Sequence, residues 1–226
     1  MKSSLSLLIG ATLSLAASLS LAATGATCRS TGSVSVSSTI KVEKGTYDGG
    51  CKTFNGTSAL GDGSQSESQK PYFRISGGAT VKNVIIGKNG ADGIHTYGNA
   101  TLDNITWTDV GEDAMTIKQA GNVTVKNITG GKGEDKFFQQ NAEGTLTVSN
   151  CIINGAAKAY RQNGGTKFKT AVTLTGCDIS NLKEGVFRTD SSTSTASLRN
   201  SRIRSVPKIC IGYASGKCTS SGVTNF

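Results

Sequence analysis

Short stretches of alternating apolar and polar residues recur along this chain. Alternation with a period of two predicts a β-strand that buries one face. Six such stretches, spaced by 21 to 26 residues, end on an asparagine or a glycine. They read ATVKN, ATLDN, VTVKN, LTVSN, VTLTG and ASLRN, and end at Asn83, Asn104, Asn127, Asn150, Gly176 and Asn200. Similarity at this spacing indicates an internal repeat.

The repeat arranges apolar residues in columns. Asparagine and glycine tolerate the left-handed backbone conformation, which would turn the chain and shift the apolar phase. The inward columns before the turn hold Ala79, Ala100, Val123, Leu146, Val172 and Ala196, and Val81, Leu102, Val125, Val148, Leu174 and Leu198. The columns after it hold Val84, Ile105, Ile128, Cys151 and Cys177, and Ile86, Trp107, Ile153, Ile179 and Ile203.

Stacked coils of this length predict an all-β, single-domain right-handed parallel β-helix over residues 24–226. The chain of 226 residues is long enough for one such domain with a substantial core. A leucine-rich repeat is the alternative repeat fold, but its leucine signature and its helix are missing. Trp107 falls in an inward column, so we expect it in the core rather than stacked on a ligand.

Residues 1–23 differ from the rest of the chain. Lys2 is followed by the apolar run LSLLIGATLSLAASLSLAA, which ends in small residues. This pattern is typical of a secretory signal peptide cleaved after Ala22 or Ala23. A membrane anchor is the alternative, but serines interrupt the run. We therefore expect a secreted, extracellular protein without a membrane partner after cleavage.

All six cysteines follow this segment, and an even number in a secreted chain favours disulfide bonds. Pairs Cys28–Cys51 and Cys210–Cys218 would each close a local loop at one end of the helix. Cys151 and Cys177 occupy one column on consecutive coils, where they could form a bond or remain an unbonded buried pair.

The formal net charge is +9, which suggests an anionic partner such as an acidic polysaccharide, a membrane surface or a nucleic acid. Nucleic acid is disfavoured because no basic stripe is interleaved with aromatic residues. We expect a monomer.

A charged column lies at the second strand of each coil. Asp92, Asp113 and Lys136 each lie nine residues beyond their turn asparagine, and Lys158 lies eight beyond its own. Glu112 precedes Asp113, so three carboxylates would lie together and repel one another. Calcium is the ion that best neutralises such a cluster while leaving positions for other oxygen ligands.

Two alternatives to a calcium site exist. A solvated ladder of surface ion pairs would contribute little to stability. Zinc is disfavoured because the single histidine, His95, has no cysteine or histidine companion. We expect His95 to be a packing or hydrogen-bonding residue of a turn.

Carboxylates that bind calcium beside Lys136, Lys158 and Arg161 suggest chemistry on a uronic acid polymer. Calcium would bridge protein and substrate carboxylates and acidify the proton at C5. A lysine or arginine would remove that proton, and the C4 oxygen would leave by β-elimination. The ion, a second lysine and an arginine would lower the pKa of a lysine base, which predicts an alkaline optimum.

At these residues the chain resembles the pectate lyases of polysaccharide lyase family 3. The matching stretches are GDGSQSESQKPYFRI, VKNVIIGKNGADGIHTYG, WTDVGEDAMTIK, EDKFFQQN and KAYRQNGG, within roughly residues 40–220. The resemblance implies an extracellular, calcium-dependent, β-eliminating enzyme.

By motif, the resemblance implies roles for single residues. Asp92, Glu112 and Asp113 match calcium ligands, and Lys136 matches the proposed base. Lys158 and Arg161 match residues that bind substrate acid groups, and Arg161 is the other candidate base. Glu67 matches an acidic position near the cleft, where it would bind substrate, act as a further calcium ligand or donate a proton. The chain departs from the family at Gly111, where cysteine is common, and after Arg161, where QNGGTKFK replaces cysteine-containing sequence.

Two other functions remain open at this point. A glycoside hydrolase on the same fold would use Asp92, Glu112 and Asp113 as acid and base around a water. A non-catalytic β-helix would bind acidic glycans without cleaving them. The formation or absence of an unsaturated uronide distinguishes these possibilities.

Overall fold

The computed structural model describes residues 21–226, so most of the predicted signal peptide lies outside the described residues. The described part contains 17 β-strands joined in one sheet, and none of its segments forms a helix that could cross a membrane. The strands are β1 (Ser33–Val36), β2 (Ile40–Val42), β3 (Thr46–Gly56), β4 (Phe73–Ser76), β5 (Thr80–Ile86), β6 (Ile94–Tyr97), β7 (Ala100–Trp107), β8 (Asp113–Gln119), β9 (Gly121–Gly131), β10 (Lys136–Gln140), β11 (Gly144–Gln162), β12 (Thr170–Arg188), β13 (Thr195–Arg199), β14 (Arg202–Arg204), β15 (Cys210–Ile211), β16 (Cys218–Ser221) and β17 (Thr224–Asn225).

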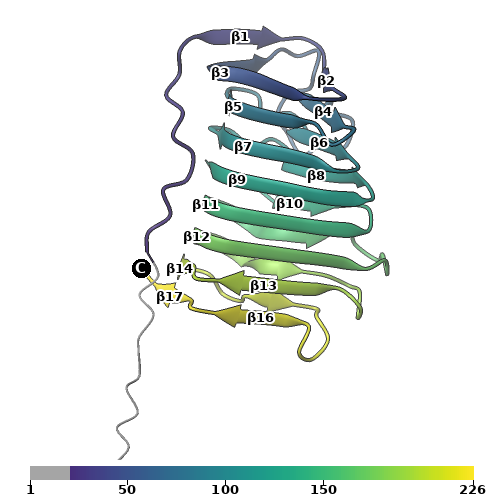
Figure 1. The fold of residues 1–226 in the computed structure, drawn as a ribbon, viewed down its shortest axis with the longest axis vertical. Helices are drawn as coiled ribbons and strands as arrows, with labels where there is room; N and C mark the ends of the chain where they lie inside the picture. The colour runs from purple at the N-terminus through teal and green to yellow at the C-terminus, as the bar shows by residue number, and fades with distance from the viewer. Residues whose placement is uncertain (1–20) are drawn as a thin grey trace, which may run out of the picture.

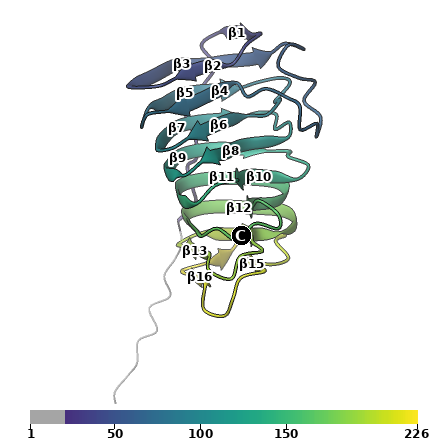
Figure 2. The same cartoon turned by 90° about the vertical axis from the view of Figure 1, so that its right-hand side faces the viewer.

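The strands wind into stacked coils, and the predicted parallel β-helix is confirmed. One stack runs through β3, β5, β7, β9, β11 and β12 (Figure 1), and a second runs through β4, β6, β8 and β10 (Figure 2). Neighbouring strands within each stack pair in parallel. Val125, for example, pairs with Leu102 on one side and with Val148 on the other. All residues of the two predicted columns before the turn are at most 4% exposed. Trp107 is buried in the core, as expected.

The turn residue of each coil adopts the left-handed conformation that the sequence predicted. The asparagines at these turns have φ between 44° and 59°, and Gly176 has φ 62°. Their side chains also bond from coil to coil, since Asn104 donates to Asn83 over 2.8 Å and Asn150 donates to Asn127 over 2.8 Å. The asparagines therefore form a ladder along one corner of the helix.

Three disulfide bonds are present. Cys28–Cys51 and Cys210–Cys218 form as predicted. The remaining pair, Cys151–Cys177, is also bonded and links β11 to β12, which settles the alternative that the sequence left open.

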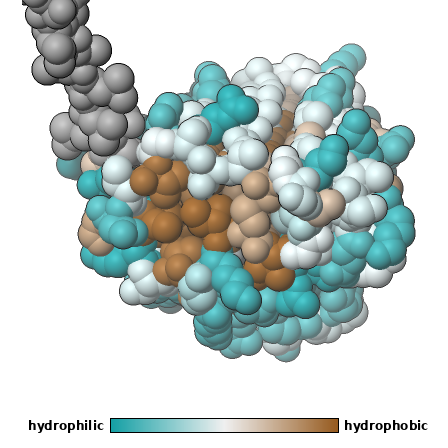
Figure 3. Space-filling view, turned by 90° about the horizontal axis from the view of Figure 1, so that it is seen from below, coloured by the Kyte–Doolittle hydropathy of each residue, from teal (hydrophilic) through white to brown (hydrophobic). Residues whose placement is uncertain are grey.

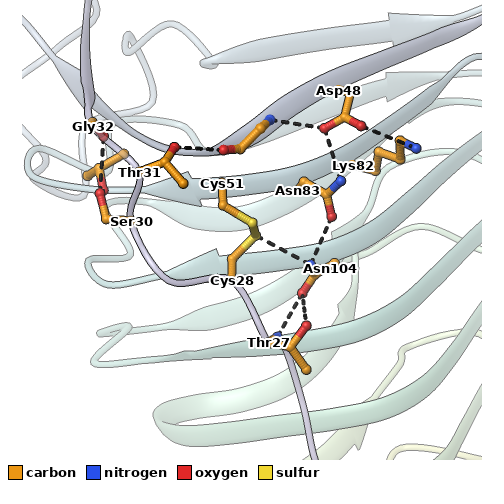
Figure 4. Close-up of a disulfide and its surroundings, with 12 residues drawn as sticks. Thr27, Cys28, Ser30, Thr31, Gly32, Asp48, Cys51, Lys82, Asn83 and Asn104 are labelled. Atoms are coloured by element: carbon orange, nitrogen blue, oxygen red, sulfur yellow. Dashed lines mark hydrogen bonds and ion pairs between the residues drawn. A yellow bond between two sulfur atoms is a disulfide. The ribbon is translucent and has the colours of Figure 1, made fainter.

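The segment 24–28 runs along the asparagine ladder against the direction of coil stacking (Figures 1 and 4). Its backbone N–H groups donate to side chains of three coils: Thr24 to Asn150, Ala26 to Thr129, and Thr27 to Asn104 over 2.7 Å. The bond from Cys28 to Cys51 then fixes it to β3. We call this segment the N-terminal strap.

The C-terminal end of the helix is less completely covered. Apolar residues of the last coils, such as Val206, Ile209 and Tyr213, pack against the core but are only partly buried. The view onto this end shows an apolar patch on the surface (Figure 3).

Candidate active site

The charged residues gather at the start of the second strand stack, where β6, β8, β10 and β11 lie on consecutive coils (Figure 2). Lys136 pairs in register with Asp113 on one side and with Lys158 on the other, as the sequence predicted. A second column lies three residues further along each strand and contains Thr116, Gln139 and Arg161 in register. Two parallel columns therefore build the site.

The structure brings the three predicted metal ligands together. Asp92, Glu112 and Asp113 each offer a carboxylate oxygen, and these oxygens lie within 4.8 Å of one another. All three residues are buried, with exposures of 3%, 4% and 1%. The cluster is therefore not a solvated ladder of surface charges.

Burial governs the electrostatics of this cluster. It raises the pKa of Glu112 to about 8, with additional repulsion from Asp92 and Asp113. It also raises the pKa of Asp113 to about 7, although the charge of Lys136 opposes the shift. Oδ1 of Asp92 and Oδ1 of Asp113 are buried without a hydrogen-bond partner among the residues described. Converging, unsatisfied carboxylate oxygens fit a hard cation such as Ca²⁺.

Lys136 lies between two carboxylates. Its Nζ is 2.9 Å from Oδ2 of Asp135 and 3.7 Å from Oδ1 of Asp113. Burial lowers the pKa of Lys136, but attraction to Asp113 and the hydrogen bond to Asp135 outweigh it, so the pKa is raised. Asp113 and Asp135 thus oppose the decrease in the pKa of Lys136 that we expected from calcium, Lys158 and Arg161.

The two other predicted cations are also paired. Lys158 is buried and forms ion pairs with Asp135 and, over 3.0 Å, with Glu184. Arg161 makes a two-pronged contact with Asp190, at 2.7 and 3.3 Å. This contact and the N–H of Gly165 lower the pKa of Asp190 to about 2.

Sequence reasoning assigned no role to Asp135 or Asp190. Asp135 directly precedes Lys136, as Glu112 precedes Asp113, so the column could have indicated it. Asp190 follows the end of β12 and has no place in the repeat. Its contact with Arg161, 29 residues away, appears only in the folded chain.

Glu67 lies apart from the cluster. It is exposed on the loop between β3 and β4, and it lies close enough to contribute to the raised pKa of Glu112. The loop is tied to the cluster's coil by Gln65, whose Nε2 donates to the carbonyl of Gly111 over 2.6 Å.

His95 is buried, but it does not lie in a turn as expected. It belongs to β6, and its Nε2 is 2.7 Å from Oδ2 of Asp92 without the alignment of a hydrogen bond. The structure also explains the glycine at position 111, because a Cβ there would lie 2.2 Å from the carbonyl oxygen of Ala91. A cysteine at this position would push two coils apart.

Comparisons with known proteins identify the family of this chain. The family model for pectate lyase matches residues 24–219. Pectate lyase E of Emericella nidulans is 36% identical over 189 residues, covering 81% of this chain and 73% of that protein. A probable pectate lyase E of Neosartorya fischeri is 35% identical over 188 residues, with the same coverage of both chains.

Solved structures share the fold. Pectate lyase PelI from Erwinia chrysanthemi superposes with a TM-score of 0.70 at 25% identity, covering 82% of this chain and 70% of that one. Its catalytic domain gives a TM-score of 0.64 at 23% identity, covering 88% and 99%. PelI has also been solved in complex with tetragalacturonic acid, and that structure gives a TM-score of 0.59 at 22% identity over 82% of this chain and 69% of that one. From the matching family model, the similar relatives and the shared fold, we conclude that this chain belongs to the pectate lyase family.

Proposed function

We propose that the protein is a secreted, calcium-dependent pectate lyase that cleaves de-esterified polygalacturonate by β-elimination. The observation that carries the proposal is a buried cluster of three carboxylates with Lys136 in the adjacent register position. Membership of the pectate lyase family supports cleavage of this polymer. The structure of PelI with tetragalacturonic acid supports a polymer of galacturonic acid as the substrate.

Asp92, Glu112 and Asp113 would hold the calcium ion. Bound there, the ion would polarise the uronate carboxylate, acidify its α proton, and offset the carboxylate charges that raise the pKa of Lys136. Thr116 holds one of these ligands in place, since its hydroxyl lies 3.2 Å from Oδ2 of Asp113.

Lys136 is the better candidate for the base that removes the C5 proton. A lysine can become neutral, whereas an arginine stays protonated at any pH an enzyme works at. Arg161 is also held by Asp190, whose Oδ2 lies 2.7 Å from Nη2 of the arginine. Arg161 and Lys158 are therefore assigned to binding and orienting substrate carboxylates. Glu67, on the loop beside the cluster, is assigned to the substrate-binding rim.

The test is the ultraviolet absorbance of unsaturated uronide, released from polygalacturonate with and without chelator. We expect chelator to abolish the activity while most of the fold stays intact, and added calcium to restore it. Full activity in excess chelator would contradict calcium dependence. A saturated product would indicate a glycoside hydrolase, and binding without cleavage would indicate a non-catalytic protein.

A matched pair of variants locates the ion. Asp113→Asn removes one ligand charge, and we expect the calcium concentration for half-maximal activity to rise about tenfold or more. Asp103→Asn makes the same change on β7, where Asp103 pairs with Lys126 outside the site, and should leave the titration unaltered. Equal titrations for both variants would place the ion elsewhere.

The remaining parts of the proposal have separate tests. Polygalacturonate of low methylation should be cleaved faster than highly methylated pectin, because esters remove the charges that the ion, Lys158 and Arg161 bind. N-terminal sequencing of exported protein tests the cleavage site after Ala22 or Ala23. Light scattering tests the expected monomer.

A further inference from the structure

A column of outward-facing side chains runs along the helix beside the charged column. It takes one residue from each coil, and pairing in register places Lys41, Arg74, His95, Thr116, Gln139, Arg161 and Arg188 in it. Cations stand at both ends, and the acid cluster lies beside His95 and Thr116. We call this row the outer column.

Most cations of the site are already compensated. Asp135 pairs with both Lys136 and Lys158, Asp190 pairs with Arg161, and Glu184 pairs with Arg188 over 2.6 Å. These cations lie at the level of the acid cluster or towards the C-terminus. A substrate carboxylate that binds one of these cations must share it with a carboxylate of the protein.

Arg74 is different. It lies on β4, one coil to the N-terminal side of His95, and it has no carboxylate within ion-pair distance among residues 21–226. Its neighbours Phe73 and Ile75 point into the core, and Arg74 itself is exposed. On this coil the outer column therefore presents an uncompensated cation that faces solvent.

The guanidinium of Arg74 is also held in place. Its Cζ lies 4.2 Å from the centre of the Tyr97 ring, in a cation–π contact. A planar guanidinium carries N–H groups that can bind a carboxylate with two parallel hydrogen bonds. Because the ring orders the long side chain beforehand, less conformational entropy is lost when a ligand binds.

We propose that Arg74, supported by Tyr97, binds the carboxylate of a uronate unit on the N-terminal side of the acid cluster. This inference rests on the proposed function, since it extends the binding of the same polymer. Arg74 and Arg161 are four strand spacings apart, about 19 Å along the helix axis. A substrate must therefore be several sugars long to contact both, so Arg74 sets the chain length that is bound best.

The experiment compares Arg74→Gln with Arg29→Gln on galacturonate oligomers of increasing length and on the polymer. Arg29 is an exposed arginine next to Cys28 of the strap, so its replacement removes the same charge away from the outer column. We expect Arg74→Gln to raise KM about threefold to fivefold for long oligomers. The KM for the shortest cleaved oligomer should stay unchanged, and so should kcat at every length. Arg29→Gln should match the wild type for all substrates.

A second variant separates the charge from its support. Tyr97→Leu leaves Arg74 in place but removes the ring, so its effect on KM should have the same length dependence and be smaller. If Arg74→Gln lowers activity equally at every length, or at none, the inference is wrong. If the wild type releases no unsaturated product from any galacturonate, the proposed function fails instead, and the two failures are distinguishable.

Discussion

At the scale of single residues, Asp135 is central to the charge balance of the site. One carboxylate oxygen contacts Lys136 and the other contacts Lys158, so a single acid holds both lysines. This pairing fixes their positions before a substrate arrives, which is the arrangement expected of preorganised catalytic groups. It also favours the protonated form of Lys136, so a base at this position needs a further positive charge nearby.

We predict that Lys136→Ala lowers turnover by about 10²–10⁴-fold, the typical cost of losing a general base. Calcium affinity and the thermal midpoint, measured in the presence of calcium, should change little, because Lys136 is not a ligand in the proposed site. The rate of unsaturated product formation measures the effect.

Arg161→Lys is the paired variant. It keeps the charge but loses the two-pronged contact, so we expect KM to rise more than kcat falls. The opposite pattern, with Lys136→Ala near normal and Arg161→Lys inactive, would make Arg161 the base.

Asp190→Asn tests the contact that positions Arg161. The pKa of Asp190 is lowered from 3.8 to about 2, mainly by the hydrogen bonds from Arg161. A lowered carboxyl pKa contributes stability above the unfolded value, and this contribution disappears as the pH falls from about 4 through 2. The side chain is 37% exposed, so we expect a loss below about 1 kcal/mol at pH 7.

Urea unfolding of both proteins between pH 7 and pH 2.5 measures this loss. The difference between wild type and Asp190→Asn should narrow as the pH falls. A difference that stays constant over this range would show that the charge of Asp190 is not its cause.

At the scale of elements, the corner turn is the unit that makes the coils uniform. Each turn residue bends the chain in the left-handed region, and the side chains of Asn104, Asn127 and Asn150 donate hydrogen bonds to the coil beside them. Glycine provides the same bend at position 176 without that bond. Both residue types therefore adopt the left-handed conformation that the turn requires, and asparagine can also connect neighbouring coils.

We predict that Asn127→Ala lowers the free energy of unfolding by about 2 kcal/mol. Alanine is strained at the observed φ of 55°, and the bonds to Asp103 and Asn150 are lost. Asn127→Gly loses the same bonds without the strain, so it should be about half as harmful in urea unfolding. Equal losses for the two variants would show that backbone conformation does not matter here.

At the scale of the whole molecule, the N-terminal strap runs opposite to the direction in which the coils stack and connects several of them. It reaches from Asn150 on β11 to Cys51 on β3, across several coils. The strap covers the asparagine ladder, whereas the site lies on the second strand stack (Figures 1 and 2). The strap and the proposed active site thus lie on different sides of the helix.

Removing the bond that anchors the strap tests this separation. The double variant Cys28→Ala, Cys51→Ala opens a link between residues 23 apart, and the chain-entropy cost is about 3 kcal/mol of unfolding free energy. Calcium-dependent activity at 25 °C should remain near that of the wild type. Reduced activity in a variant that is still fully folded would mean that the strap also shapes the site.

The sequence by itself determined the repeat, its inward columns, the turn residues and the register of Asp92, Asp113, Lys136 and Lys158. It could do so because each coil of a parallel β-helix lies directly on the previous one. A fixed offset along the chain therefore becomes a fixed position in space. Wherever the repeat was regular, counting from the asparagine placed a residue correctly.

Only the tertiary structure decided the features that do not follow the repeat. The strap binds Asn150 from 126 residues away, Asp190 reaches Arg161 from beyond the end of β12, and His95 contacts Asp92 from within β6. The raised pKa of Lys136 likewise results from opposing effects, since burial lowers it and two nearby carboxylates raise it. Such contacts depend on side-chain rotamers, loop paths and the exclusion of water, and none of these is encoded in the spacing of residues along the chain.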